Sequence, residues 1–291
     1  ASVAVSLIGS ALMSLLILKL FDAHVAGARD LTGVPAEDVR PAGRLAMRRM
    51  AVMAVIALAV IATGAAYALV NQLQLDGETA VMAHRGASAA APENTLAAIR
   101  GAIESGADWV EIDVQETADG EVIVAHDSDF MKLAGVALKV WDGTLAEIQA
   151  IDVGSWFAPE FADQRTPTLI DVLKESKGKA HVVIELKYYG HDEKLEQRVI
   201  EIVEQLDMVE EIAIMSLKYD AVQKVRKLRP DWNIGLLSAQ VLGNMSNLDV
   251  DFLAVNTAMA SPTFIRTNQG AGKQVFVWTV NDKMSMFRMM S

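Results

Sequence analysis

The sequence contains no cysteine, so no disulfide can stabilise it, and a chain of 291 residues is large enough to do without one. Aromatic residues make up only 6% of the chain, and there is neither an internal repeat nor a low-complexity segment. Basic residues are in the minority, with 26 Lys and Arg against 37 Asp and Glu and a formal net charge of −11. This acidic balance excludes nucleic acid as the expected partner, because binding to a phosphate backbone needs a basic surface.

Charge is also absent from two long apolar runs, residues 2–18 and 51–70. A helix of about 20 apolar residues spans the hydrocarbon core of a bilayer. We therefore expect one transmembrane helix over 1–20 and a second over 51–70. A buried core helix is the alternative for both runs. A signal peptide is a poor alternative for the first, because it would need positive charge before its apolar part, and here Lys19 follows it.

The distribution of basic residues predicts the orientation of these helices. Residues 1–70 hold 6 basic and 4 acidic residues, which leaves 26−6=20 basic and 37−4=33 acidic residues for the remainder. Short loops rich in Arg stay in the cytoplasm. We therefore expect a cytoplasmic loop over 21–50, a linker over 71–79, and a catalytic domain over 80–291 on the outer side of the cell membrane, with the lipid bilayer as a partner.

From residue 80 onward, short apolar runs alternate with amphipathic stretches, a pattern typical of a parallel sheet covered by helices. Helical spacing occurs over 95–106, 194–206 and 219–230, with Asn94 as the expected N-cap of the first helix. Eight strands favour an irregular TIM (β/α)8 barrel. They are expected over 80–84, 109–114, 121–126, 181–186, 211–216, 233–237, 251–255 and 274–279.

Two connections depart from an ideal barrel. The second and third strands are joined only by QETADG, which is too short for a helical crossover, so we expect an irregular or antiparallel connection there. Residues 127–180 form a long connection that contains Trp141, Trp156 and Phe157. We expect it to be a lid-like insertion beside the pocket, with a simple packing insertion as the alternative.

Charged residues stand where buried strands should end. Side chains at positions i and i+2 of a strand share a face, and TIM-barrel active sites lie at the carboxyl ends of the strands. A single histidine or acidic pair there is commonly structural, but seven such groups on four consecutive strands are not explained in that way. They are His84, Arg85, Glu111, Asp113, His126, Glu185 and Lys187.

The types of these residues predict a reaction. Three clustered carboxylates repel one another unless a cation lies among them, and oxygen ligands suit Ca²⁺ or Mg²⁺. Arg85 and Lys187 beside such a cation would bind an anion with several oxygens, typically a phosphate. Two histidines supply an acid and a base near neutral pH. The residues therefore favour metal-assisted cleavage of a phosphodiester.

The motifs HRGAS, PENT, the EID of WVEIDVQ, VIVAHD, the ELK of VVIELK, and VWTVN occur in this order over residues 80–283. The set resembles the motifs of glycerophosphodiester phosphodiesterases, within the phospholipase-C-like phosphodiesterase superfamily. The resemblance implies an irregular TIM barrel that hydrolyses a glycerophosphodiester to sn-glycerol 3-phosphate and an alcohol with a divalent cation. It further implies metal ligands at Glu111, Asp113 and Glu185, an acid/base pair at His84 and His126, phosphate contacts at Arg85 and Lys187, a pocket-lining Trp278, and supporting roles for Glu93 and Asn94.

Several alternatives stay open at this point. A lysophospholipase D or a phospholipase-C-like lipid hydrolase would use the same residues, and the substrate could be a small molecule, a lysolipid or a teichoic-acid-like polymer. A domain that only binds glycerophosphate would lack a histidine or a ligand, and a transport accessory would need more helices. Family members commonly continue past VWTVN to a segment resembling GIITDRP, whereas this chain ends in NDKMSMFRMMS, so we expect the closing segment to be missing.

Overall fold

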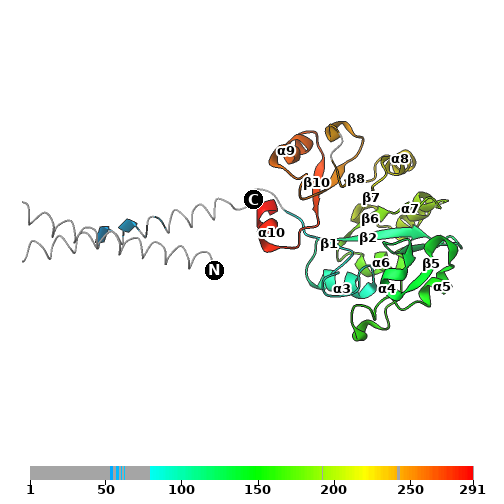
Figure 1. Cartoon of the computed structure of the whole chain (residues 1–291). Coiled ribbons are helices and arrows are strands. Elements are labelled where there is room, and N and C mark those ends of the chain that lie inside the picture. Colours follow the sequence, from blue (N-terminus) through cyan, green and yellow to red (C-terminus); the bar gives the residue numbers. More distant parts are fainter. Residues whose placement is uncertain are drawn as a thin grey trace, which may run out of the picture. The chain divides into compact units, whose positions relative to one another are not determined.

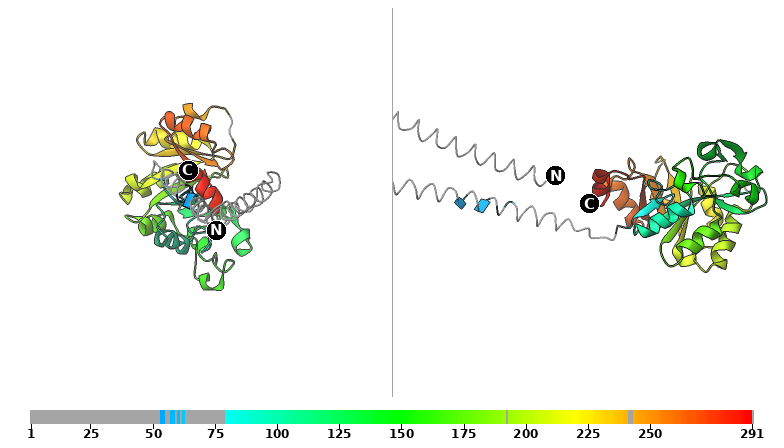
Figure 2. Two further views of the ribbon diagram at one scale, coloured as in Figure 1. Left: turned by 90° about the vertical axis from the view of Figure 1, so that its left-hand side faces the viewer. Right: turned by 90° about the horizontal axis from the view of Figure 1, so that it is seen from below.

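The computed structural model describes residues 53–54, 57–58, 60, 62 and 79–290, except 192, 241 and 242. The chain divides into two compact units, Ala1–Gly77 and Glu78–Ser291. All the elements below belong to the second unit, which Figures 1 and 2 show as coloured ribbon.

The predicted transmembrane helices over 1–20 and 51–70, the loop over 21–50 and the linker over 71–79 lie outside the described residues, apart from isolated positions. Among the described residues, no helix has the length and apolar character needed to cross a bilayer. A spanning helix needs about 20 apolar residues, whereas α7 (Leu195–Gln205) has 11 and carries charged residues on one face. The prediction of a cell-membrane location with an outward-facing catalytic domain is therefore wrong on this structure and is not carried further.

The unit is built around one curled sheet, and each of the eight predicted strands is present in it. The hydrogen-bonded order is β1-β2-β6-β7-β8-β9-β10, all parallel, and β3 pairs with β2 in the antiparallel sense. The strands are β1 Met82–His84, β2 Trp109–Glu116, β3 Val122–Val124, β6 His181–Leu186, β7 Ile212–Ser216, β8 Ile234–Ser238, β9 Phe252–Asn256 and β10 Gln274–Trp278.

The sheet is barrel-like but is not closed by hydrogen bonds. Within the described part of the chain, no ladder joins β10 to β1, so the two ends of the strand order remain edges. The antiparallel β3 follows from the tight turn after β2, where Gly120 has φ +81° and its N–H donates to the Thr117 carbonyl at 2.9 Å. The predicted irregular connection between the second and third strands is confirmed.

Helices cover the outer face of the sheet (Figure 1). Their first residues follow side-chain caps at three places, where a hydroxyl accepts a backbone N–H: Thr95 before α3, Thr168 before α6 and Ser261 before α9. The helix predicted from Asn94 therefore begins one residue later than expected. The helices of this layer, besides α7, are α3 Leu96–Glu104, α6 Leu169–Ser176, α8 Tyr219–Leu228, α9 Pro262–Gly270 and α10 Lys283–Met290.

The connection between β3 and α6 has a small core of its own, formed by Ile123, Phe130, Val140 and Ile148 among others. A two-stranded antiparallel sheet packs in it together with short helical segments. These elements are β4 Asp129–Phe130, α4 Met131–Ala134, β5 Val136–Lys139, η1 Val140–Asp142, α5 Leu145–Gln149 and η2 Pro159–Phe161. Two further short helices, η3 Val209–Glu211 and η4 Met245–Asn247, precede β7 and β9.

Candidate active site

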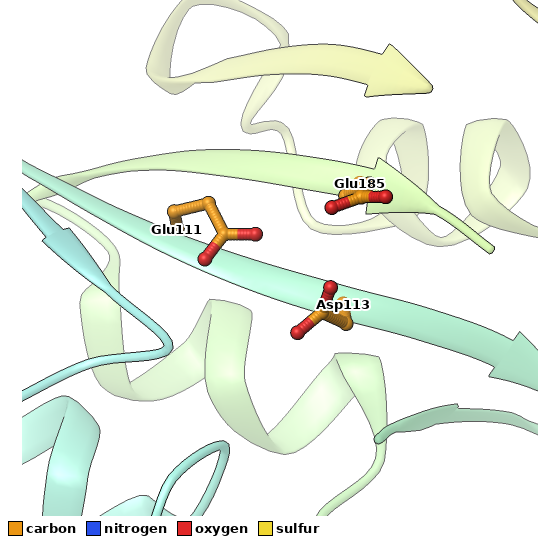
Figure 3. Close-up of side chains that lie close together, drawn as sticks. All are labelled: Glu111, Asp113 and Glu185. Atoms are coloured by element: carbon orange, nitrogen blue, oxygen red, sulfur yellow. The ribbon is translucent and has the colours of Figure 1, made fainter. Parts of the chain in front are cut away.

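Three carboxylates meet on the inner side of the sheet, two from β2 and one from β6 (Figure 3). Asp113 of β2 lies opposite Glu185 of β6 in the parallel register, and Glu111 precedes Asp113 on the same face. One oxygen of each of the three carboxylates lies within 4.8 Å of the other two. The residues are 2%, 1% and 5% exposed for Glu111, Asp113 and Glu185, so the cluster is screened from water.

The hydrogen bonds of the described residues do not satisfy every acceptor oxygen of the cluster. Glu111 Oε1 and Asp113 Oδ1 are buried and lack a hydrogen-bond partner. Asp113 Oδ1 nevertheless forms an ion pair with Lys187 Nζ at 3.2 Å, so among the described residues Glu111 Oε1 is the ligand oxygen that lacks a partner. Unsatisfied buried oxygens are costly, and all-oxygen ligation is what Ca²⁺ and Mg²⁺ prefer. The three carboxylates fit a hard divalent cation.

The proton affinities of the cluster reflect its crowding. Burial, followed by the charges of Asp113 and Glu185, raises the pKa of Glu111 well above its ordinary value. Burial and the Asp113 charge raise the pKa of Glu185 to about 7. Burial alone would raise the pKa of Asp113 too, but Lys187 and other nearby cationic groups outweigh it and hold the pKa below its usual range. Without a cation, the cluster therefore retains protons near neutral pH.

Lys187 lies beside the carboxylates, at the end of β6. Its ammonium is 2.9 Å from Glu185 Oε1, and its side chain is only 10% exposed. Burial would lower the pKa of Lys187, but the Asp113 and Glu185 carboxylates raise it above its ordinary value. The ammonium is thus a fixed positive charge at the edge of the acidic cluster.

The end of β1 brings His84 and Arg85 to the same cluster. His84 Nε2 is 3.9 Å from Glu111 Oε2, and the Arg85 backbone N–H donates to that oxygen at 2.9 Å. Arg85 has φ +57°, in the left-handed region, and Gly86 follows with φ +76°. A Cβ at Gly86 would lie 2.7 Å from the Ala98 backbone, so the HRG motif needs glycine at its third position.

Two residues of the PENT segment, Glu93 and Asn94, form hydrogen bonds with Arg85 and Asp113. Asn94 has φ +58°, a conformation that asparagine tolerates, and its Nδ2 donates to Asp113 Oδ2 at 2.9 Å. Arg85 Nη1 donates to Glu93 Oε1 at 3.1 Å, and Arg85 Nε is 3.5 Å from Asp113 Oδ2. Asn94, which is 4% exposed, therefore orients a candidate ligand and does not cap the helix.

His126 follows β3, in an irregular segment across the site. Its Nδ1 lies 2.7 Å from Asp127 Oδ1, a contact that leaves Nε2 available to a substrate. A small pocket beside His126 is lined by Glu93, Asn94 and Asp127 among others.

Trp278 is the last residue of β10, and it packs with the apolar side chains inside the sheet. Its indole Nε1 is buried and has no hydrogen-bond partner. Its apolar neighbours in this cluster include Met82 of β1 and Val183 of β6, which belong to the strands that carry the site.

Four residues of this neighbourhood were not predicted from the sequence. Asp127 orients His126, Lys132 Nζ donates to Glu93 Oε1 at 2.9 Å, and Gln115 and Tyr189 both donate to the main chain around His126. Gln115 could have been found, because it continues the i, i+2 series of Glu111 and Asp113 on β2. Asp127 follows directly after His126 in VIVAHD.

The model of the glycerophosphoryl diester phosphodiesterase family matches residues 84–291, from the first of these histidines to the end of the chain. The chain belongs to this family. A glycerophosphodiester phosphodiesterase of Caldanaerobacter subterraneus is 35% identical over 222 residues, which are 73% of this chain and 90% of that relative. A Bacillus subtilis relative described as a putative glycerophosphodiester phosphodiesterase is 32% identical over 70% of this chain and 86% of its own length.

Solved structures of the family have the same fold. A phosphodiesterase of Oleispira antarctica, solved with the product sn-glycerol-3-phosphate, superposes with a TM-score of 0.67 at 26% identity, covering 72% of this chain and 88% of that chain. The Agrobacterium tumefaciens glycerophosphodiester phosphodiesterase gives 0.62 at 30% identity, over 72% and 91%. The family, the enzyme class and the TIM-barrel-like fold predicted from the sequence are confirmed.

Proposed function

We propose that this chain hydrolyses glycerophosphodiesters to sn-glycerol 3-phosphate and an alcohol, with a divalent cation at Glu111, Asp113 and Glu185 and with His84 and His126 as its acid/base pair. The observation that carries the proposal is the buried triad of carboxylates, whose Glu111 Oε1 has no hydrogen-bond partner and whose Glu111 Oε2 lies 3.9 Å from His84 Nε2. Membership of the family and the similarity to a product complex support the substrate class.

The cation, Ca²⁺ or Mg²⁺, would supply charge stabilisation for the phosphate oxygens. The chain's own residues supply the rest. Arg85 and Lys187 already lie at the edge of the acidic cluster, with guanidinium and ammonium groups held by Glu93 and Glu185. Both would contact the phosphate, and the Trp278 indole N–H would line the same pocket as an additional donor.

The histidines divide the proton transfers between them. The contact of Asp127 with His126 Nδ1 leaves Nε2 to deliver a proton, and this favours His126 as the acid that protonates the leaving alcohol. His84, beside Glu111, would then take the proton of the attacking group, either water or the neighbouring glycerol hydroxyl. Attack by the glycerol hydroxyl would form a cyclic phosphate, which water then opens.

The direct test is release of glycerol 3-phosphate from glycerophosphocholine by the purified chain with Ca²⁺ or Mg²⁺, with and without EDTA, beside His126→Ala. We expect release that EDTA abolishes and that His126→Ala lowers by about 10²- to 10⁴-fold, the range for a general acid. Release that persists in EDTA would overturn the cation assignment. Release by His126→Ala at the native rate would overturn the assignment of the acid.

A parallel assay with lysophosphatidylcholine and with a poly(glycerol phosphate) defines the breadth of the substrate class. Faster turnover of the lysolipid than of glycerophosphocholine would replace the proposal by a lysophospholipase D. Tight binding of the polymer without any turnover of the three substrates would replace it by a glycerophosphate-binding role.

A further inference from the structure

His126 lies in a segment that no sheet ladder holds. The last strand residue before it is Val124, and the chain bends from His126 to Ser128 before β4 begins. The Ala125 N–H still donates to the Asp113 carbonyl at 2.9 Å, but the carbonyls that follow have no strand partner among the described residues. The direction of the imidazole therefore depends on what holds these carbonyls in place.

A buried glutamine holds them. Gln115, which is 3% exposed, follows Glu111 and Asp113 on the inner face of β2. Its Nε2 lies 2.7 Å from the Ala125 carbonyl and 2.8 Å from the Asp127 carbonyl, with the His126 carbonyl at 3.4 Å. Carbonyl oxygens only accept, so the atom that faces them must be the amide nitrogen, and its two N–H groups match the two short contacts.

A tyrosine, Tyr189, also holds the main chain at His126. The Tyr189 hydroxyl, on the loop after β6, donates to the His126 carbonyl at 2.7 Å. Its ring lies 6.0 Å from that of Trp141, which in turn stacks on His191 at 4.2 Å. The loop after β6 is thus joined to the 127–180 connection by aromatic contacts, and the hydroxyl is held over the His126 main chain.

We propose that Gln115 and Tyr189 are positioning residues for His126, which fix the main chain on both sides of its imidazole without touching the substrate. Asp127 orients the ring, and these two residues orient the backbone from which the ring projects. The inference rests on the proposed acid/base role of His126. A displacement of about 1 Å at a reacting group can lower a rate by roughly 10²-fold, so such residues have large kinetic effects.

The test compares four variants on two substrates, with His126→Ala as a fifth variant for reference. Gln115→Met keeps the volume and removes both amide donors, and Tyr189→Phe removes only the hydroxyl. Gln223→Met and Tyr219→Phe are the matched controls, since Gln223 Nε2 donates to the Asp249 carbonyl at 2.8 Å and the Tyr219 hydroxyl accepts from the Asp249 N–H at 3.2 Å, away from His126. The substrates are glycerophosphocholine and its p-nitrophenol counterpart, whose leaving group needs no proton.

We expect Gln115→Met to lower kcat for glycerophosphocholine by roughly 10- to 100-fold with little change in KM, and Tyr189→Phe to lower it by a smaller factor. The loss should be much smaller with the p-nitrophenyl substrate. His126→Ala defines the expected substrate dependence, and the control variants should resemble the native chain. Affinity for Ca²⁺, titrated directly, should stay unchanged in all four variants.

The outcomes separate the two proposals. If His126→Ala has the activity of the native chain, the proposed function fails at His126. If His126→Ala shows the leaving-group dependence but both positioning variants have native activity or lose both substrates equally, the positioning role is overturned. Tyr189 is 41% exposed, so Tyr189→Phe remains a valid test if Gln115→Met fails to fold.

Discussion

The two faces of β2 are equally buried but chemically opposite. Val110, Ile112 and Val114 are each 0% exposed and pack in the main core of the unit. On the other face, Glu111, Asp113 and Gln115 are 2%, 1% and 3% exposed, and their polar atoms meet carboxylates, a lysine and main-chain carbonyls. β6 repeats the division, with Ile184 and Leu186 in the main core and Glu185 between them in the acidic cluster.

This difference separates stability from function within single strands. The apolar face gains the free energy of burial, roughly 1.5–3 kcal/mol for a fully buried aliphatic side chain. The polar face holds like charges and unpaired oxygens that lower the stability of the metal-free protein. Because side chains alternate along a strand, the packing of the apolar face fixes the positions of the polar residues. Four experiments test whether the two faces act separately.

The largest effect is expected on the polar face. Glu111→Gln keeps the shape of the side chain and removes a cation ligand, so kcat with Ca²⁺ or Mg²⁺ should fall by about 10³-fold, because the charge stabilisation lost is several kcal/mol. The same change removes a buried carboxyl whose pKa is raised by burial, so the free energy of unfolding of the metal-free protein near pH 7 should not decrease. Turnover assays and denaturant unfolding check both expectations.

The control for this variant is Ca²⁺ itself. Ca²⁺ should raise the thermal midpoint of the native chain and should raise that of Glu111→Gln much less. If Glu111→Gln unfolds more easily than the native metal-free chain, the carboxylate is a structural element and the division between the faces is wrong.

The apolar face should respond in the opposite way. Ile112→Ala opens a cavity among side chains that are fully buried, so the free energy of unfolding should fall by about 2–5 kcal/mol. Activity per folded molecule should stay close to native, because no atom of the acidic cluster is removed. Urea unfolding and kcat, normalised to folded protein, measure the two quantities, with Ile112→Val as a milder companion.

A smaller effect is expected on the affinity for the cation, which should depend on pH. The pKa of Glu185 is raised from 4.5 to about 7, so the folded metal-free protein holds this proton more tightly than the unfolded chain. Its contribution to stability is complete below 4.5 and is lost as the pH rises through about 7. A cation must displace the proton, so affinity for Ca²⁺ should rise as the pH rises through about 7.

Calorimetric titration of Ca²⁺ at pH 6, 7 and 8, in two buffers with different heats of ionisation, measures the released proton. Affinity that is flat across this range, with no proton release, would show that the cation does not bind at Glu185.

Much of this division was visible in the sequence. The spacing in WVEIDV placed Glu111 and Asp113 on one face of the strand, and all eight predicted strands lie within a few residues of those observed. The order of motifs identified the family. These features depend on local periodicity and on residue types at strand ends, which the chain displays directly.

The features of the fold and the site that the sequence does not predict depend on contacts between segments far apart in the chain. Nothing local indicates that Tyr189 reaches the His126 carbonyl, 63 positions away, or that the sheet has no ladder between β10 and β1. The membrane location was inferred from length and charge alone, and the described helices do not support it. Asn94 was predicted to be a helix cap, but its side chain donates a hydrogen bond to Asp113. This contact depends on the left-handed backbone conformation of Asn94, which the sequence does not reveal.

The smallest effect is expected at the N-cap of α9, which belongs to neither face of β2. The Ser261 hydroxyl accepts the Phe264 N–H at 3.2 Å and caps α9, on the exposed side of the unit. Ser261→Ala should lower the free energy of unfolding by about 1 kcal/mol, while Ser261→Asp, which keeps an acceptor and adds a negative charge at the helix N-terminus, should lose little or none of it. Neither variant should change kcat or Ca²⁺ affinity. If Ser261→Ala lowers kcat, motion of α9 reaches the acidic cluster, and the two faces of the sheet are not independent.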